Sequence, residues 1–198
     1  LSNMGIKLHV AWRDKPTRRG FSMIDSQGER AITVIGERLA PNYRDNLDWD
    51  ILKKMDGIFI TASDSEIFKM ARSASILCTT PRVGINTINK SNVSLDGLIG
   101  SNLDPGEEFS FSELLVKPKY TIKTEGEKGG IIFPGGRYEA LKNKDRKVDS
   151  YGCGDSFAAG ILYGMASNWD IDKSLNLAKV IGRDSSEFFG PYANSDEK

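Results

Sequence analysis

Apolar and polar residues alternate along the first part of the chain. The alternation covers residues 6–10, 20–24 and 31–35, and polar turn residues separate these runs. A period of two is typical of short strands that bury one face. Residues 26–29 predict a hairpin turn between the last two strands. We therefore expect a small β-sheet lid over residues 1–41, whose apolar side covers a substrate site or a second subunit.

From about residue 47 the pattern changes to helices and strands in turn. Helices are predicted near residues 47–55, 64–74, 155–167 and 172–184. Strands are predicted at residues 57–61, 75–79, 97–100, 120–123 and 130–133. Such alternation predicts right-handed βαβ units, and so an α/β domain over residues 42–198 with a mostly parallel central sheet flanked by helices.

The carboxyl ends of these strands are where a ligand is expected. In open α/β sheets, ligands bind outside this edge of the sheet. The loops that follow Thr61, Thr79, Gly100 and Thr124 are therefore the places to search.

Composition narrows the choice of partner. The 198 residues include 27 Lys and Arg and 27 Asp and Glu, so the formal net charge is zero. No global field draws such a chain to nucleic acid or to an anionic membrane, and a small molecule fits better. Two cysteines without metal-ligand spacing indicate a reducing cytoplasm. The sequence also has no apolar stretch long enough to cross a bilayer.

The chain opens with residues 1–6 in a pattern that resembles the end of a helix running into a strand. We expect that this is not a natural amino terminus.

A glycine-flanked turn leads into a helix at residues 149–160, with the sequence Asp-Ser-Tyr-Gly-Cys-Gly-Asp-Ser-Phe-Ala-Ala-Gly. Its glycines allow a tight turn that points successive N–H groups at one place, and the helix adds its own unpaired donors. This pattern predicts an anion site. Asp155 stands at the helix start, where the helix dipole favours the ionised carboxylate that a general base needs. In isolation, the pattern is equally typical of a turn with an N-terminal cap.

Other phosphate motifs fit the sequence less well. It has no Gly-x-x-x-x-Gly-Lys-Ser/Thr loop, and Phe157 stands where the dinucleotide fingerprint requires its third glycine. His9 is the one histidine, so histidine triads and histidine metal clusters are disfavoured.

Residues 149–157 resemble the signature Asp-Thr-x-Gly-Ala-Gly-Asp-x-Phe of the ribokinase-like (PfkB) carbohydrate kinases. The resemblance implies the ribokinase-like fold and an ATP-dependent kinase. It makes Asp155 the catalytic base, and it makes the N–H groups of residues 152–155, including Gly152, Cys153 and Gly154, the anion hole. Cys153 stands in place of the usual alanine.

Two further segments are similar to motifs of this family. Thr124, Gly126 and Gly129 resemble the Thr-x-Gly-x-x-Gly turn that contacts ATP phosphates, although alone they would predict a hairpin turn. Asp149 is assigned to the same cofactor site. Asp104 and Glu107 are similar to the Asn-x-x-Glu motif that organises Mg²⁺ and phosphate, with aspartate in place of asparagine. The nearby Asn102 leaves this correspondence open.

The resemblance also assigns substrate contacts and a subunit contact. Arg82 stands where the family often has an arginine near the phosphate or the acceptor, and Arg18 in the lid is expected to reach the substrate. Solvated surface arginines are the alternative for both. The lid closes the acceptor site in the family and pairs two subunits in many members, so a homodimer through the lid is expected.

About a third of the family's sequence has no counterpart in this chain, including the Gly-Gly-rich acceptor loop and an aspartate that binds substrate hydroxyls. We therefore expect the carboxy-terminal part of a larger sugar kinase that uses ATP, Mg²⁺ and a monovalent cation such as K⁺. A nucleoside kinase and a non-catalytic module that binds a nucleotide or a sugar phosphate are the alternatives.

Overall fold

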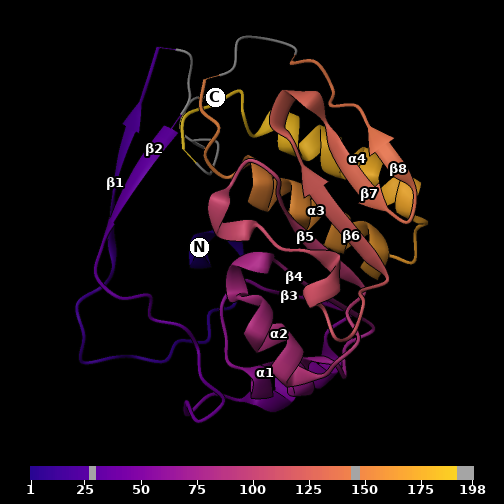
Figure 1. The fold of residues 1–198 in the computed structure, drawn as a ribbon. Coiled ribbons are helices and arrows are strands. Elements are labelled where there is room, and N and C mark those ends of the chain that lie inside the picture. The colour runs from indigo at the N-terminus through magenta and orange to yellow at the C-terminus, as the bar shows by residue number, and fades with distance from the viewer. Residues whose placement is uncertain (27–29, 144–147, 191–198) are drawn as a thin grey trace.

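The computed structural model describes residues 1–26, 30–143 and 148–190, and it contains two separate sheets. The smaller sheet is an antiparallel pair of β1 (Arg19–Ile24) and β2 (Arg30–Ile35). Figure 1 shows this pair, the lid, standing beside the rest of the molecule, with the amino terminus between the two. The small sheet expected near the start of the chain is therefore present, with two strands.

The larger sheet has the strand order β3-β4-β5-β6-β7-β8. Its strands are β3 (Gly57–Ile60), β4 (Ile76–Thr79), β5 (Gly97–Ser101), β6 (Tyr120–Thr124), β7 (Gly130–Phe133) and β8 (Gly136–Tyr138). The pairs from β3 to β6 are parallel, and β7 and β8 are antiparallel to their neighbours. The α-helices are α1 (Ser65–Ala71), α2 (Ile85–Ser91), α3 (Cys153–Ala166) and α4 (Ile171–Asp184). The prediction of an α/β fold with a mostly parallel sheet is confirmed.

Each face of the larger sheet has its own hydrophobic core. Successive strand residues point to opposite faces. Accordingly, Leu77 and Leu98 pack into the core that includes α1 and α2, whereas Cys78 and Ile99 pack into the core with α3 and α4. The strands are buried on both faces, as parallel sheets require.

Helix α3 runs antiparallel to the strands. Gly57 at the start of β3 lies so close to the last turns of α3 that an added Cβ would be 3.1 Å from Leu162 and from Ala166. The end of α3 is therefore near the beginning of a strand, and its first turn lies toward the carboxyl ends of the strands. This places the glycine-rich turn at the edge where a ligand was expected.

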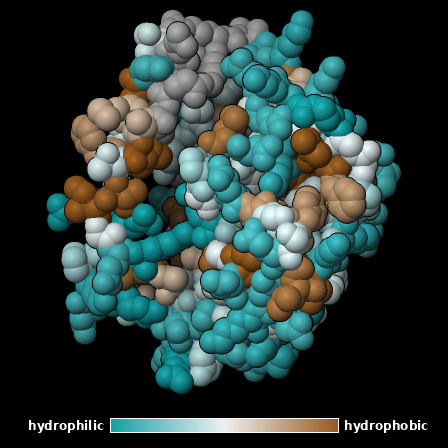
Figure 2. Space-filling view, in the orientation of Figure 1, coloured by the Kyte–Doolittle hydropathy of each residue, from teal (hydrophilic) through white to brown (hydrophobic). Residues whose placement is uncertain are grey.

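The lid exposes apolar side chains on both of its faces. The pairing of Phe21 with Thr33 puts Phe21, Met23 and Ile35 on one face, which we call the outer face, and Ile24, Ile32 and Val34 on the other, the inner face. The outer residues are 55–64% exposed and the inner ones 37–50% exposed. Figure 2 shows these brown side chains gathered at the left of the molecule. Neither face is fully covered by the described residues.

Several expectations about local structure were wrong. Residues 6–10 form no strand, because the described chain offers them no strand to pair with, and Ile6, Leu8 and Val10 stay about half exposed. The helix expected near residues 47–55 is only a 3-10 helix, Trp49–Lys54. Helix α2 and strand β8 were not predicted. In the expected turn at 26–29, residues 27–29 lie outside the described part of the chain.

No helix in the described residues is long and apolar enough to span a membrane.

Candidate active site

The glycine-rich turn begins helix α3 earlier than the sequence predicted. Gly152 has a φ of +85°, a left-handed conformation that favours glycine, and the helix starts at Cys153 instead of residue 155. The N–H groups of Gly154 and Asp155 are therefore first-turn donors, which have no acceptor within the helix. Gly154 and Asp155 are both exposed, and an added Cβ on Gly154 would meet no atom within 4 Å. The surface around this first turn is therefore open.

Asp149 stabilises this turn through hydrogen bonds to backbone N–H groups. Its side chain is 0% exposed, and its two carboxylate oxygens accept N–H groups of Tyr151 at 3.0 Å and of Gly190 at 3.0 Å. The first contact closes the turn, and the second fixes the chain that follows α4. The structure thus places Asp149 beside the predicted cofactor loop with its carboxylate directed to backbone groups.

Asp155 lies in the first turn of α3 and is exposed. Within the described chain its carboxylate makes no hydrogen bond or ion pair. A carboxylate in a buried salt bridge could not serve as a base, and Asp155 is not in that situation. It is available to a substrate hydroxyl.

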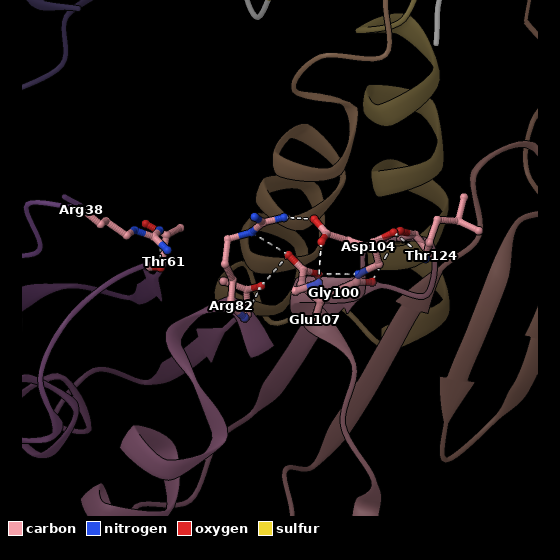
Figure 3. Close-up of polar contacts among 11 residues, drawn as sticks. Arg38, Thr61, Arg82, Gly100, Asp104, Glu107 and Thr124 are labelled. Carbon is pink, nitrogen blue, oxygen red and sulfur yellow. Dashed lines mark hydrogen bonds and ion pairs between the residues drawn. The ribbon is translucent and has the colours of Figure 1, made fainter. Parts of the chain in front are cut away.

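A charged cluster lies at the carboxyl ends of β4 and β5 (Figure 3). Glu107 is 8% exposed and accepts hydrogen bonds from Arg82 Nε at 3.0 Å and from the Ser101 N–H at 2.6 Å. Thr80 Oγ1 lies 3.3 Å from the same carboxylate. Arg82 also donates from Nη2 to Asp104, whose other oxygen caps the 3-10 helix Pro105–Glu107. Three predicted site residues, Arg82, Asp104 and Glu107, are thus in direct contact.

Gly100 makes room for this cluster. An added Cβ would lie 2.7 Å from Glu107 Oε2 and 2.8 Å from Pro81 Cδ. Only a residue without a side chain allows the Glu107 carboxylate to reach the end of β5.

The two carboxylates hold Arg82 in its charged form. Desolvation lowers the pKa of Arg82, but the nearby charges of Asp104 and Glu107 raise it more, so the net pKa is raised. Arg82 is therefore a fixed cation between the turn that follows β6 and the lid.

These carboxylates do not fit the direct coordination of a magnesium ion in this arrangement. Each oxygen of Asp104 and Glu107 already accepts a hydrogen bond, and the Arg82 guanidinium occupies the place of a cation between them. In the described residues no group of three or more His, Cys, Asp or Glu side chains could hold a metal. The expected metal ligands are thus committed to Arg82.

The predicted phosphate turn joins β6 to β7. Gly126 and Gly129 have positive φ angles of +59° and +83°, and an added Cβ on Gly129 would lie 2.0 Å from the Tyr138 carbonyl oxygen. Glu125 accepts from Arg137 Nη2 at 2.5 Å and from Asn102 Nδ2 at 2.9 Å, and these two contacts lower its pKa. The turn that follows Thr124 is therefore held firmly at the carboxyl end of β6.

Two arginines approach the site from the lid. Arg18 precedes β1 and is exposed, and it contacts none of the other predicted site residues. Arg38, which the sequence analysis missed, follows β2 and donates from Nη2 to the Thr61 carbonyl oxygen at 2.9 Å. Figure 3 shows Arg38 and Arg82 reaching the ends of the neighbouring strands β3 and β4. The sequence signal that could have identified Arg38 is a basic residue shortly after the last lid strand.

The described part of the chain has two open hollows near these loops. One, of about 580 Å³, is lined by Asn102, Glu108, Phe109, Ser110, Glu113 and Lys123. The other, of about 530 Å³, lies at the base of the lid and is lined by Lys15, Pro16, Thr17, Arg19, Ile35, Gly36, Glu37 and Leu39. Asp155 lines neither of these two hollows and is exposed.

Structures with the same fold come from kinases of two acceptor classes. They include a probable sugar kinase from Rhizobium etli (TM-score 0.66, 18% identity, covering 91% of this chain and 63% of that one). An adenosine kinase from Sinorhizobium meliloti has a TM-score of 0.68 and 18% identity, with 90% and 63% coverage. An Arabidopsis thaliana ribokinase complexed with ribose and ATP has a TM-score of 0.64 and 15% identity, with 89% and 65% coverage.

This chain therefore spans slightly less than two thirds of the length of these relatives. No curated protein sequence matches it. Residues 111–192, which include the glycine-rich turn and Asp155, match the family described as pfkB family carbohydrate kinase. The resemblance to the pfkB family carbohydrate kinases is thus confirmed, by the family match over these residues and by the shared ribokinase-like fold over most of the chain.

Proposed function

We propose that this chain is the nucleotide-binding and catalytic part of an ATP-dependent kinase that phosphorylates a hydroxyl of a small sugar. The observation that carries the proposal is the exposed Asp155 carboxylate in the first turn of α3, beside the open N–H groups of Gly154 and Asp155. Proton acceptor and anion donors stand together at the carboxyl edge of the sheet. Phosphoryl transfer needs this pairing.

In the proposed reaction, the acceptor oxygen forms a bond to the γ-phosphorus of ATP. The bond from that phosphorus to the β,γ-bridging oxygen breaks, and ADP leaves with its electron pair. The hydroxyl proton passes to Asp155. The N–H groups of Gly154 and Asp155 bind the oxygens of the moving phosphoryl group, whose charge they stabilise without reorganising. The Cys153 N–H already donates to the Ser150 carbonyl oxygen at 3.3 Å.

The nucleotide would bind along the turn at residues 124–130 and extend to the start of α3. Support comes from the rigid geometry of this turn and from the related Arabidopsis ribokinase, which was solved with ribose and ATP. Asp149 would act by holding the α3 turn, because its carboxylate is buried against backbone N–H groups. Bound Mg²⁺ would neutralise phosphate charge, and it would have to bind without direct ligation by Asp104 and Glu107, since both are paired with Arg82.

The inner face of the lid, which carries Ile24, Ile32 and Val34, would cover the acceptor and exclude water. The outer face, with Phe21, Met23 and Ile35, is more exposed and would pair with a second copy of the chain. A two-stranded sheet with apolar side chains on both faces needs two partners to bury them.

The decisive experiment replaces Asp155 by asparagine in the full-length protein. We expect the turnover number to fall between about a hundredfold and ten-thousandfold, the range for a lost general base. The affinity for ATP, measured by calorimetry, should stay within about a factor of two, because Asp155 acts on the acceptor.

A matched control is Asp172→Asn, which removes another exposed carboxylate in the first turn of a helix, α4. Its turnover should equal that of the unaltered protein. Turnover that survives Asp155→Asn would refute the base assignment and favour a non-catalytic binding module.

A nucleoside acceptor is the second candidate, because the adenosine kinase from Sinorhizobium meliloti shares the fold as closely as the sugar kinase does. A panel of sugars and nucleosides, assayed for ADP release, separates the two acceptor classes.

A further inference from the structure

The turn that would bind the ATP phosphates is itself acidic. Residues 124–130 include two glutamates, Glu125 and Glu127, and one lysine, Lys128. The side chains of this turn therefore sum to a negative charge, which would oppose the binding of phosphate groups. The Glu125 side chain is 15% exposed, so water screens its charge only in part. A turn of this composition needs a positive charge from elsewhere in the fold.

Arg137 on β8 supplies that charge. Its Nη2 donates to Glu125 Oε2 at 2.5 Å. The other carboxylate oxygen, Oε1, accepts from Asn102 Nδ2 at 2.9 Å, so both oxygens of Glu125 are occupied. These hydrogen bonds lower the pKa of Glu125 and keep it ionised at neutral pH. The carboxylate is thus held by residues 12 and 23 positions away along the chain, on β8 and after β5.

The backbone of the turn prevents Glu125 from moving out of it. The Glu125 N–H donates to the Gly129 carbonyl oxygen at 2.7 Å, and the Glu125 carbonyl oxygen accepts the Lys128 N–H at 3.2 Å. Asn102 donates its own N–H to the Thr124 carbonyl oxygen at 2.8 Å. If Arg137 were absent, the Glu125 carboxylate would therefore stay in the turn as an unpaired negative charge.

The charge of Glu125 acts toward helix α3 as well. Burial raises the pKa of Tyr138, and the negative charge of Glu125 raises it further, as expected for a carboxylate near that phenol. The Tyr138 ring stacks on Phe157, with the ring centroids 6.0 Å apart. Phe157 lies two residues after Asp155 in α3. A phosphate group placed between the turn and the start of α3 would therefore lie within the field of Glu125.

We propose that Arg137 is a positioning residue for ATP, which neutralises the Glu125 carboxylate and holds it in a pair, so that the turn does not repel the phosphates. Arg137 acts through Glu125 in this role and needs no contact with ATP. The inference rests on the proposed kinase function. It adds to the nucleotide site a residue that lies outside both the turn and the glycine-rich motif.

The test measures ATP binding by calorimetry with the full-length protein. Arg137→Gln should weaken ATP binding about tenfold, because an unpaired carboxylate then faces the phosphates. The loss should shrink in about 1 M salt, which screens charges beyond about 3 Å. Arg137→Lys keeps the charge and should bind ATP within about threefold of the unaltered protein. In steady-state assays, Arg137→Gln should raise the KM for ATP with little change in kcat.

A second substitution separates the effect of charge from that of mechanical support. Adding Glu125→Gln to Arg137→Gln removes the unpaired charge, and it should restore ATP affinity to within about threefold of the unaltered protein. A purely structural role predicts no such rescue, since the double variant has lost further contacts. Arg13→Gln is the matched control, because it breaks an ion pair of the same kind, with Asp45 at 2.6 Å, outside the turn. Its ATP affinity should equal that of the unaltered protein.

The two proposals fail in different ways. Unchanged ATP affinity in Arg137→Gln, or a double variant that binds ATP no better than Arg137→Gln alone, would overturn the role of Arg137 and leave the kinase function standing. Turnover that persists in Asp155→Asn would remove the proposed base and leave the dependence of ATP binding on Arg137 intact. An unaltered protein that binds no ATP would overturn both proposals.

Discussion

Asp149 is a fully buried carboxylate that serves backbone groups. Its oxygens accept the N–H groups of Tyr151 and Gly190, and so join the α3 turn to the chain after α4. A buried carboxylate is tolerated where hydrogen bonds replace its hydration. The sequence motif places this residue next to the anion site, but only the structure shows its support of the loop.

Replacing Asp149 by asparagine should destabilise the protein, because the amide can present only one acceptor to the two N–H groups. Leaving one buried donor unsatisfied costs about 1–3 kcal/mol. The measurement is urea unfolding, with Asp50→Asn as the control, since Asp50 forms an exposed ion pair with Lys53. Equal stability of the two variants would contradict the supporting role.

The two cysteines should differ sharply in reactivity. Burial raises the pKa of the Cys78 thiol to about 12, so at about pH 8 it carries almost no thiolate, the reactive form. Cys153 lies partly exposed in the first turn of α3. Mass spectrometry after treatment with iodoacetamide should find Cys153 labelled and Cys78 intact. Added ATP should slow the reaction of Cys153, and no protection by ATP would argue against a phosphate site at this turn.

At the scale of single residues, the sequence predicted the positions that a motif marks and missed those that depend on distant partners. Asp155 and the glycines around it follow from local backbone chemistry. The contacts of Arg82 with Asp104 and Glu107 span 22 and 25 residues of sequence, and no local pattern encodes them. Arg38 was missed for the same reason, because its acceptor, Thr61, lies 23 residues away, directly after β3.

Helices α3 and α4 pack closely because glycines face the contact. An added Cβ on Gly160 would lie 2.7 Å from the Ala178 Cα, and one on Gly164 would lie 2.4 Å from Ser174 Oγ. The nearest atoms that the Gly160 Cβ would meet belong to the Ala178 backbone, which cannot move aside as a long side chain can, so a larger residue would push the two helices apart. The position of the α3 turn over the strand edge therefore depends on small residues about two and three turns further along the helix.

Gly160→Ala should lower the stability by about 1–3 kcal/mol, the range for overpacking a core. Gly154→Ala is the matched control, because it adds the same methyl group to the same helix where nothing lies within 4 Å. Its stability should stay level or rise by up to about 1 kcal/mol through helix propensity. Thermal unfolding of both variants decides the point, and a Gly160→Ala protein as stable as the control would contradict the close contact.

The sequence predicted the helices and strands that have a strong hydrophobic pattern, and it did not predict those that lack one. The apolar runs of β3 to β7 and the small-residue helix α3 are plain in the sequence. Helix α2 contains Asn, Thr and Ser at positions where strong helix formers are usual. Its low helix propensity therefore gives little helical signal in the sequence. Residues 6–10 show the opposite case, since a strand pattern yields a strand only where a neighbouring strand supplies hydrogen bonds.

The whole molecule divides its tasks along the edge of one sheet. The candidate nucleotide turn lies at the end of β6, the Arg82 cluster at β4 and β5, and Arg38 at the end of β3. This order follows from the alternation of strands and helices, and the α/β class was predictable from it. The arrangement of the lid was not, because its apolar residues on both faces leave the choice of partners to tertiary structure.

A dimer formed through the outer face of the lid should dissociate when Phe21 is replaced by lysine, since a charge would be buried in an apolar contact. Ile32→Lys, on the inner face, should leave the dimer intact and weaken acceptor binding instead. Sedimentation velocity of the full-length variants measures the first effect and calorimetry the second. A monomeric unaltered protein, or loss of the dimer in both variants, would contradict the assignment of the two faces.

The Arg38 side chain extends from the segment after the lid to the end of β3, and the positive charges of Arg18 and Arg82 act on its guanidinium. Its hydrogen bond to the Thr61 carbonyl oxygen ties the segment after β2 to the end of β3. A movement of the lid must therefore either break this bond or displace the first strand of the larger sheet. The lid is thus mechanically coupled to the edge of the sheet through a single guanidinium.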